Sequence, residues 1–118
     1  MKTILIVDDR EETVWALYTL LERLGHLPVI AKTAREALER LMEFMPDAIV
    51  LDLAMPGLDG YEFLDLLRAD PRHVKTRVIV YTGMVDHIDV RRLVSRGVFE
   101  ILIKSADADK VAACLAAV

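Results

Sequence analysis

Five polar side chains in this sequence each stand at the end of a short apolar run: Asp8, Asp9, Asp52, Thr82 and Lys104. If those runs are strands of one parallel sheet, their carboxyl ends place the five side chains on one rim of that sheet. Three carboxylates held close repel one another and need compensating positive charge. Mg²⁺ supplies such charge, prefers oxygen ligands and keeps water positions that phosphate oxygens can occupy.

Such a rim can transfer a phosphoryl group. Asp52 would be the nucleophile, attacking phosphorus in line and becoming an aspartyl phosphate. Lys104 offers a second positive point charge to a phosphate oxygen, and the hydroxyl of Thr82 offers a hydrogen bond to another. The metal would neutralise and orient the group in transfer.

Each of these residues also has a simpler interpretation. Asp8 or Asp9 could cap the following helix, and Asp52 could end its strand and cap a turn. Thr82 could be an ordinary strand-end residue and Lys104 a solvated lysine. For no site to exist, all of these simpler interpretations would have to be true at once, for residues that meet at the same rim. Such a coincidence is improbable, which favours a shared site.

The length of 118 residues indicates one domain, residues 1–118, with one hydrophobic core. Because 54% of the residues are hydrophobic, disorder is not expected. The net charge of -4 disfavours direct nucleic-acid binding. Cys114 is the only cysteine, which excludes an internal disulfide. The sequence shows no secretory signal, and no apolar run approaches the roughly 20 residues of a membrane span. We therefore expect a cytoplasmic protein.

Strands and helices are predicted to alternate along the chain. The predicted strands are 3–7, 27–31, 48–52, 77–82 and 99–103, and the predicted helices are about 10–24, 33–44, 61–69, 86–96 and a last one from 105 or 107 to the C-terminus. This alternation predicts a parallel sheet with helices on both faces. Pro28 suits an edge strand, and the most apolar runs suit central ones. We expect an α/β, flavodoxin-like (βα)5 three-layer sandwich with sheet order 2-1-3-4-5.

The first helix shows a clear apolar face. Val14, Leu17, Tyr18, Leu21 and Leu24 are predicted to face the core.

The motifs resemble those of a known family. Ile6-Val7-Asp8-Asp9, the stretch LDLAMPGLDG at 51–60, Tyr81-Thr82 and Ile103-Lys104 are similar to the receiver domains of two-component response regulators. The resemblance covers essentially the whole chain. It implies that a histidine kinase or histidine phosphotransfer protein passes a phosphoryl group from a phosphohistidine to Asp52. It also implies that Mg²⁺ is bound by Asp9, Asp52 and the backbone carbonyl of Ala54, with Asp8 reaching it through water, while Lys104 and Thr82 hold the acyl phosphate.

Two positions depart from the family pattern. The family lysine is typically followed by proline, whereas Ser105 follows Lys104 here, so we expect a trans peptide bond at this point. The family also carries Tyr or Phe three residues before the lysine, whereas this chain has Ile101. We therefore expect the conformational change to stay close to Thr82, Gly83 and helix 86–96.

Two surface features suggest partners. Trp15 falls on the flank of the first helix, where it could contact the phosphodonor or pack under a neighbouring loop. A second set of charged residues could form the face of a weak homodimer, although an ordinary solvated surface is favoured. This set comprises Arg91, Arg92, Glu100, Asp107 and Asp109.

The predicted function is a phospho-acceptor in a two-component phosphorelay, which switches partner interactions by population shift. It would catalyse its own phosphorylation and slow dephosphorylation, and would not be a turnover enzyme. The first alternative is a receiver-like interaction scaffold that is never phosphorylated, which Ile101 and Ser105 mildly favour. A hydrolase of the haloacid-dehalogenase type is disfavoured. Such enzymes carry two aspartates, two residues apart, after the first strand, whereas Asp8 and Asp9 are adjacent here and the expected nucleophile, Asp52, follows the third strand. A flavin-binding protein would need a phosphate-cradling loop where Asp8 and Asp9 stand.

Overall fold

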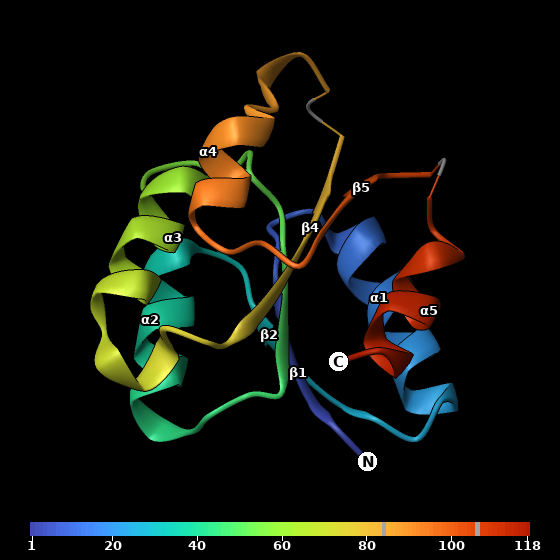
Figure 1. Cartoon of the computed structure of the whole chain (residues 1–118). Coiled ribbons are helices and arrows are strands. Elements are labelled where there is room, and N and C mark those ends of the chain that lie inside the picture. The colour runs from blue at the N-terminus through green and yellow to red at the C-terminus, as the bar shows by residue number, and fades with distance from the viewer. Residues whose placement is uncertain (84, 106) are drawn as a thin grey trace.

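A parallel sheet of five strands forms the centre of the molecule in the computed structural model, which describes residues 1–83, 85–105 and 107–118, with only the backbone of residue 87 (Figure 1). The strands are β1 (Thr3–Val7), β2 (Leu27–Ala31), β3 (Ala48–Leu51), β4 (Arg77–Thr82) and β5 (Glu100–Ile103). Every neighbouring pair is parallel, and the order is β2-β1-β3-β4-β5. The predicted flavodoxin-like α/β sandwich is confirmed.

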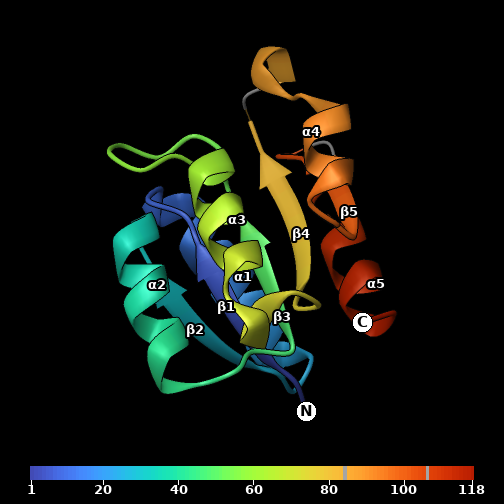
Figure 2. The same ribbon diagram turned by 60° about the vertical axis from the view of Figure 1, so that its left-hand side comes forward.

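Helices cover both faces of the sheet. They are α1 (Glu11–Arg23), α2 (Ala34–Glu43), α3 (Gly60–Ala69), α4 (Val90–Ser95) and α5 (Lys110–Ala116), with short 3-10 turns η1 (Pro71–His73) and η2 (Val85–His87). The two ribbon views place α1 and α5 on one face and α2, α3 and α4 on the other (Figures 1 and 2).

The central strands are apolar because both of their faces are buried. In β1, Ile4 and Ile6 pack against the side of α1 and α5, whereas Leu5 and Val7 pack against the side of α2 and α3. Polar side chains therefore become frequent only where these strands end. Pro28 stands on the edge strand β2, as predicted, opposite Ile4 of β1.

The fourth predicted helix is shorter than expected. Residues 85–87 form a separate 3-10 turn, and α4 begins only at Val90. Asp89 causes this late start, because it has extended backbone angles and its Oδ1 accepts the N–H of Arg92 at 3.1 Å. An N-cap of this kind fixes the first residue of a helix.

The prediction for the end of the first helix was wrong at Leu24. This residue lies just beyond the helix, and its side chain is 47% exposed. Val14, Leu17 and Leu21 form the buried stripe of α1.

The last helix also starts later than predicted. α5 begins at Lys110, and position 106, which the prediction included, lies outside the described residues. Asp107 uses its Oδ2 to accept the N–H of Ile103 at 2.7 Å, while Ser105 has a left-handed backbone with φ of 69°. The described residues contain no cis peptide bond, so the predicted trans bond between Lys104 and Ser105 is confirmed.

Among the helices that the structure describes, none has the length and apolar character needed to span a bilayer.

Candidate functional site

Sheet hydrogen bonds continue past the strand ends and hold the candidate residues in place. The N–H of Asp8 donates to Ala31 O at 3.1 Å, and the N–H of Asp52 donates to Val7 O at 2.9 Å. The N–H of Lys104 donates to Thr82 O at 2.9 Å. The backbones of β1, β3, β4 and β5 thus fix their terminal residues side by side.

Asp52 lies at the centre of this rim. It is 2% exposed, and its Oδ1 accepts hydrogen bonds from Thr82 Oγ1 at 2.9 Å and from the N–H of Ala54 at 3.2 Å. Its Oδ2 lies 3.0 Å from Lys104 Nζ. These contacts fix the orientation of the buried Asp52 carboxylate.

Lys104 also bridges to Asp8, whose Oδ2 lies 2.8 Å from Nζ. The other oxygen of Asp8 accepts the N–H of Arg10 at 2.9 Å. Burial raises the pKa of the Asp8 carboxyl, while the hydrogen bonds from Lys104 and Arg10 oppose that rise. The ammonium of Lys104 thus partly compensates two buried carboxylates.

Asp9 completes an acidic cluster. One carboxylate oxygen from each of Asp8, Asp9 and Asp52 lies within 4.8 Å of the others. Three carboxylates against one ammonium leave an excess of negative charge, which a divalent cation with oxygen ligands would balance. The donor set therefore fits the predicted Mg²⁺, with Asp9 as the most exposed of the three ligands. Ala54 stands beside Asp52 through its N–H, and the metal-binding role of its carbonyl stays a prediction.

Glycine shapes the loop that carries Asp52 into α3. The N–H of Gly60 donates to Leu53 O at 3.1 Å, and a Cβ at this position would lie 2.6 Å from Leu53 Cα. Any other residue would push α3 away from the backbone that follows Asp52. The first turn of α3 is therefore packed directly against the site.

The structure brings together all five of the side chains singled out in the sequence, Asp8, Asp9, Asp52, Thr82 and Lys104. Gly83 follows Thr82 and is exposed, so the rim stays open beside Asp52.

Tyr81 was noted in the sequence only as part of the Tyr81-Thr82 motif, and no role was predicted for its side chain. Its side chain is 6% exposed, and its hydroxyl accepts the N–H of Ser105 at 3.4 Å. It therefore links the end of β4 to the residue after Lys104. An aromatic residue directly before Thr82, in an otherwise aliphatic strand, was the signal available.

A groove of about 1000 Å³ opens beside the rim, between α1 and the segment that follows β5. Its lining combines apolar residues, among them Ala16, Leu17 and Tyr81, with charged ones, among them Arg10 and Lys104. Trp15 is 57% exposed on the same helix, and its ring meets Tyr18 edge-on at 5.5 Å between centroids. Of the two interpretations left open for this tryptophan, its exposure favours a partner contact over packing under a loop, and contact with a phosphodonor stays a prediction.

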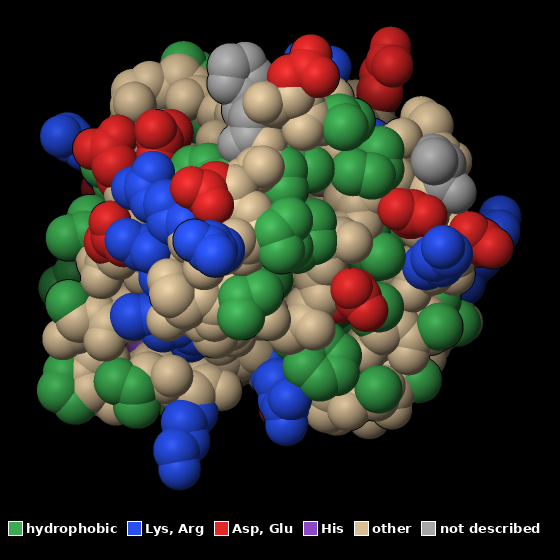
Figure 3. Space-filling view, turned by 45° about the horizontal axis from the view of Figure 1, so that its top comes forward, with side chains coloured by type: hydrophobic (Ala, Val, Ile, Leu, Met, Phe, Trp, Pro, Cys, Tyr) green, Lys and Arg blue, Asp and Glu red, His purple; other side chains and the backbone are tan. Residues whose placement is uncertain are grey.

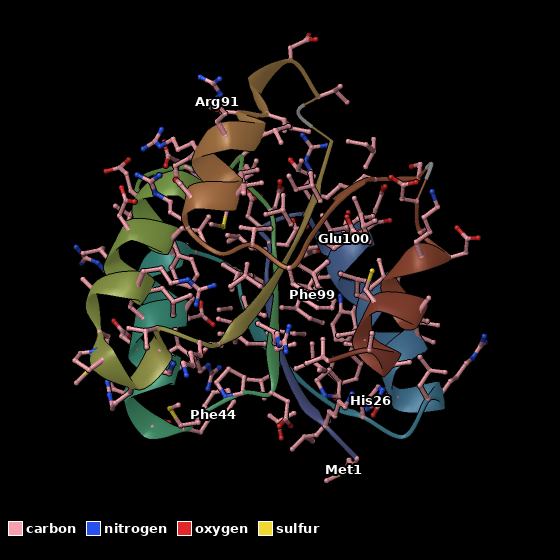
Figure 4. The ribbon with its side chains drawn as sticks, viewed as in Figure 1. Met1, His26, Phe44, Arg91, Phe99 and Glu100 are labelled. Atoms are coloured by element: carbon pink, nitrogen blue, oxygen red, sulfur yellow. The ribbon has the colours of Figure 1, made fainter. Side chains whose placement is uncertain are left out.

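Some of the charged residues considered for a dimer face form ion pairs within the chain. Arg92 pairs with Asp65 at 3.8 Å, and Asp107 pairs with Lys110 at 3.1 Å. Arg91 points outward from α4 (Figure 4). A weak homodimer stays a prediction.

Known proteins resemble this chain over nearly its whole length. The family model of the response regulator receiver domain matches residues 4–116. A protein-glutamate methylesterase/protein-glutamine glutaminase of Myxococcus xanthus is 34% identical over 104 residues, which are 86% of this chain and 29% of that protein. The transcriptional regulatory protein AfsQ1 of Streptomyces coelicolor is 33% identical, over 88% of this chain and 45% of its own length. The chain thus spans less than half of these two relatives.

One solved structure that resembles this chain was crystallised with a metal ion. The response regulator TrrA of Thermotoga maritima, crystallised in complex with Mg²⁺ and BeF, superposes with a TM-score of 0.86 at 25% identity. The match covers 99% of this chain and 98% of that one. Because the family model spans nearly all of the sequence, and the fold and acidic rim agree with it, the chain belongs to the response regulator receiver domain family of two-component signalling.

Proposed function

We propose that residues 1–118 act as the phospho-acceptor of a two-component phosphorelay, with Asp52 taking a phosphoryl group from a phosphohistidine. The donor would be a histidine kinase or a histidine phosphotransfer protein, and the modified domain would switch its partner interactions. The carrying observation is that buried Asp52 contacts both Lys104 and Thr82 and lies with Asp8 and Asp9 in one acidic cluster. Location in the cytoplasm, expected for this family, is part of the proposal.

The transfer follows from the contacts of Asp52. A carboxylate oxygen of Asp52 attacks phosphorus while the bond from phosphorus to the histidine nitrogen breaks, and the electron pair stays with the imidazole. Lys104 and Thr82 then exchange their contacts with Asp52 for contacts with phosphoryl oxygens. Asp8, Asp9, Asp52 and the carbonyl of Ala54 would hold Mg²⁺, which would supply positive charge for the phosphoryl oxygens.

Slow loss of the phosphate would come from water at the same open rim, so the domain acts as its own substrate and not as a turnover enzyme. Lys104 and Thr82 would orient the phosphoryl group both while it is transferred to Asp52 and while water removes it. The groove beside α1 would receive the donor, because Gly83 and Lys104 of the rim line it. Trp15, exposed on the same helix, would add a contact to the donor.

The test is intact-protein mass spectrometry after incubation with acetyl phosphate and Mg²⁺. Wild type should gain one phosphate, Asp52→Asn should gain none, and EDTA should suppress the gain. Asp109→Asn, a change at an exposed position of the same residue type, should behave as wild type. Phosphate on neither wild type nor variant, or equally on both, would refute the proposal, and a folded wild type without phosphate would favour the interaction scaffold.

A further inference from the structure

Tyr61, the second residue of α3, reaches across to the start of α4. Its hydroxyl accepts the backbone N–H of Asp89 at 2.7 Å. Asp89 is the residue that caps α4, since its Oδ1 accepts the N–H of Arg92. The guanidinium of Arg92 in turn lies over the ring of Tyr61, 4.4 Å from its centroid. One side chain of α3 thus holds both the cap and the first turn of α4.

The same residue is tied closely to the phospho-acceptor. Tyr61 follows Gly60, whose N–H binds Leu53 O at 3.1 Å and which leaves no room for a Cβ against Leu53 Cα. Leu53 is the residue after Asp52. A displacement of the loop after Asp52 would therefore reach Tyr61 through the direct contact between Leu53 and Gly60.

Ion pairs between α3 and α4 surround this contact but are exposed. Asp65 of α3 pairs with Arg92 at 3.8 Å and also with Arg96, and its side chain is 45% exposed. Figure 3 shows Lys and Arg side chains beside acidic ones on the left, the side that α3 and α4 occupy in Figure 1. Exposed pairs of this kind contribute little to stability, whereas the ring of Tyr61 is only 9% exposed. The buried tyrosine is the stronger connection.

We propose that Tyr61 is the positioning residue through which the phosphorylation state of Asp52 sets the position of α4. This inference rests on the proposed function and adds the route by which that site is read out. Tyr61 holds the α4 cap in one arrangement of the loop after Asp52 and releases or shifts it in the other. The route runs along α3 and does not need an aromatic residue on β5, where this chain has half-buried Ile101.

Tyr61→Phe is the direct test, because it keeps the ring under Arg92 and removes only the hydroxyl. Hydrogen exchange of the α4 amides is measured by mass spectrometry with Mg²⁺ alone and with Mg²⁺ and beryllofluoride, a phosphoryl mimic. In wild type, beryllofluoride should change α4 exchange. In Tyr61→Phe, α4 should exchange about three- to tenfold faster without beryllofluoride, as expected for the loss of one hydrogen bond. The response to beryllofluoride should largely disappear.

Two controls separate this route from general loosening. Tyr18→Phe removes a hydroxyl from α1 and should leave the α4 response unchanged. Asp65→Asn removes the exposed ion pairs and should change the response less than Tyr61→Phe does. Acetyl phosphate should still label Asp52 in Tyr61→Phe, which shows that the site itself works.

The outcomes distinguish the two proposals. Normal labelling of Asp52 together with a wild-type α4 response in Tyr61→Phe overturns the role of Tyr61 alone. A wild-type protein that neither takes phosphate nor responds to beryllofluoride overturns both proposals.

Discussion

Lys104 shares one ammonium between two buried carboxylates, with Nζ 2.8 Å from Asp8 and 3.0 Å from Asp52. Burial disfavours the ionised form of Asp8, and its pKa is raised for that reason. The folded chain thus binds the Asp8 proton more tightly than the unfolded chain does. Ionisation of Asp8 therefore costs stability as the pH rises through and above its ordinary pKa of 3.8.

Asp8→Asn removes that cost while keeping the size of the side chain. In EDTA at neutral pH, we expect this variant to melt at a higher temperature than wild type, with the difference shrinking as the pH falls towards 4. With Mg²⁺ the order of the two melting temperatures should reverse. Metal binding adds about 2.7 kcal/mol to the free energy of unfolding of wild type at a metal concentration 100 times Kd, and it adds much less to that of the variant. Thermal melts across pH, with and without Mg²⁺, measure both effects.

Asp9→Asn is the matched control for Asp8→Asn. Asp9 is less buried, so its replacement should weaken the Mg²⁺ response without raising the melting temperature in EDTA. Equal melting temperatures of Asp8→Asn and wild type in EDTA would show that burial of Asp8 imposes no such cost.

At the scale of the elements, strand positions were predictable because each central strand is a continuous apolar run that ends at a polar residue. The run Ala48–Leu51 before Asp52 is an example. Because this strand is buried on both faces, each of its residues is apolar, and the first polar residue marks its end. The start of α4 was missed although its N-cap, Asp89, is a local signal, because Asp86 offered a competing start and the contact of Asp89 with Tyr61 joins residues of two elements. The start of α5 was missed for a similar reason, since Asp107 binds the end of β5.

The segment after β5 gives a prediction at this scale. Ser105 has a φ of 69°, a left-handed conformation that costs a non-glycine residue roughly 1–2 kcal/mol. Ser105→Gly should therefore stabilise the protein by about 1 kcal/mol in urea unfolding, less the extra entropy of glycine in the unfolded chain.

Ser105→Pro, which restores the family residue, should destabilise it. Proline fixes φ near −65° and removes the N–H that Tyr81 accepts. A neutral or stabilising effect of proline here would contradict the observed backbone conformation.

At the scale of the whole molecule, the sheet order and the shared rim could be predicted because alternating strands and helices leave few right-handed arrangements. The five site residues then meet through topology alone, although Lys104 is far from Asp8 in sequence. Surfaces were less predictable. The groove beside α1 depends on where Lys104, Ser105 and Ala108 lie after β5, and neither periodicity nor composition carries that information.

Trp15 links this surface to the phosphodonor. Trp15 is 57% exposed on a helix beside the rim, so most of its apolar ring lies in water in the isolated domain. Burial against a donor would explain it, and aromatic residues commonly dominate such contacts. Trp15→Ala should therefore slow phosphoryl transfer from the cognate histidine donor by about tenfold or more, equivalent to about 1.4 kcal/mol.

The comparison with a small donor decides whether this loss belongs to docking. Acetyl phosphate needs no protein surface, so it should label Asp52 in Trp15→Ala at the wild-type rate, because Trp15 packs edge-on against Tyr18 and not against the rim. Leu27→Ala is the control, since Leu27 is 50% exposed at the start of β2, at the end of the sheet opposite Asp52. An unchanged transfer rate from the histidine donor in Trp15→Ala would remove this tryptophan from the interface, and equal slowing with acetyl phosphate would place its effect on the site.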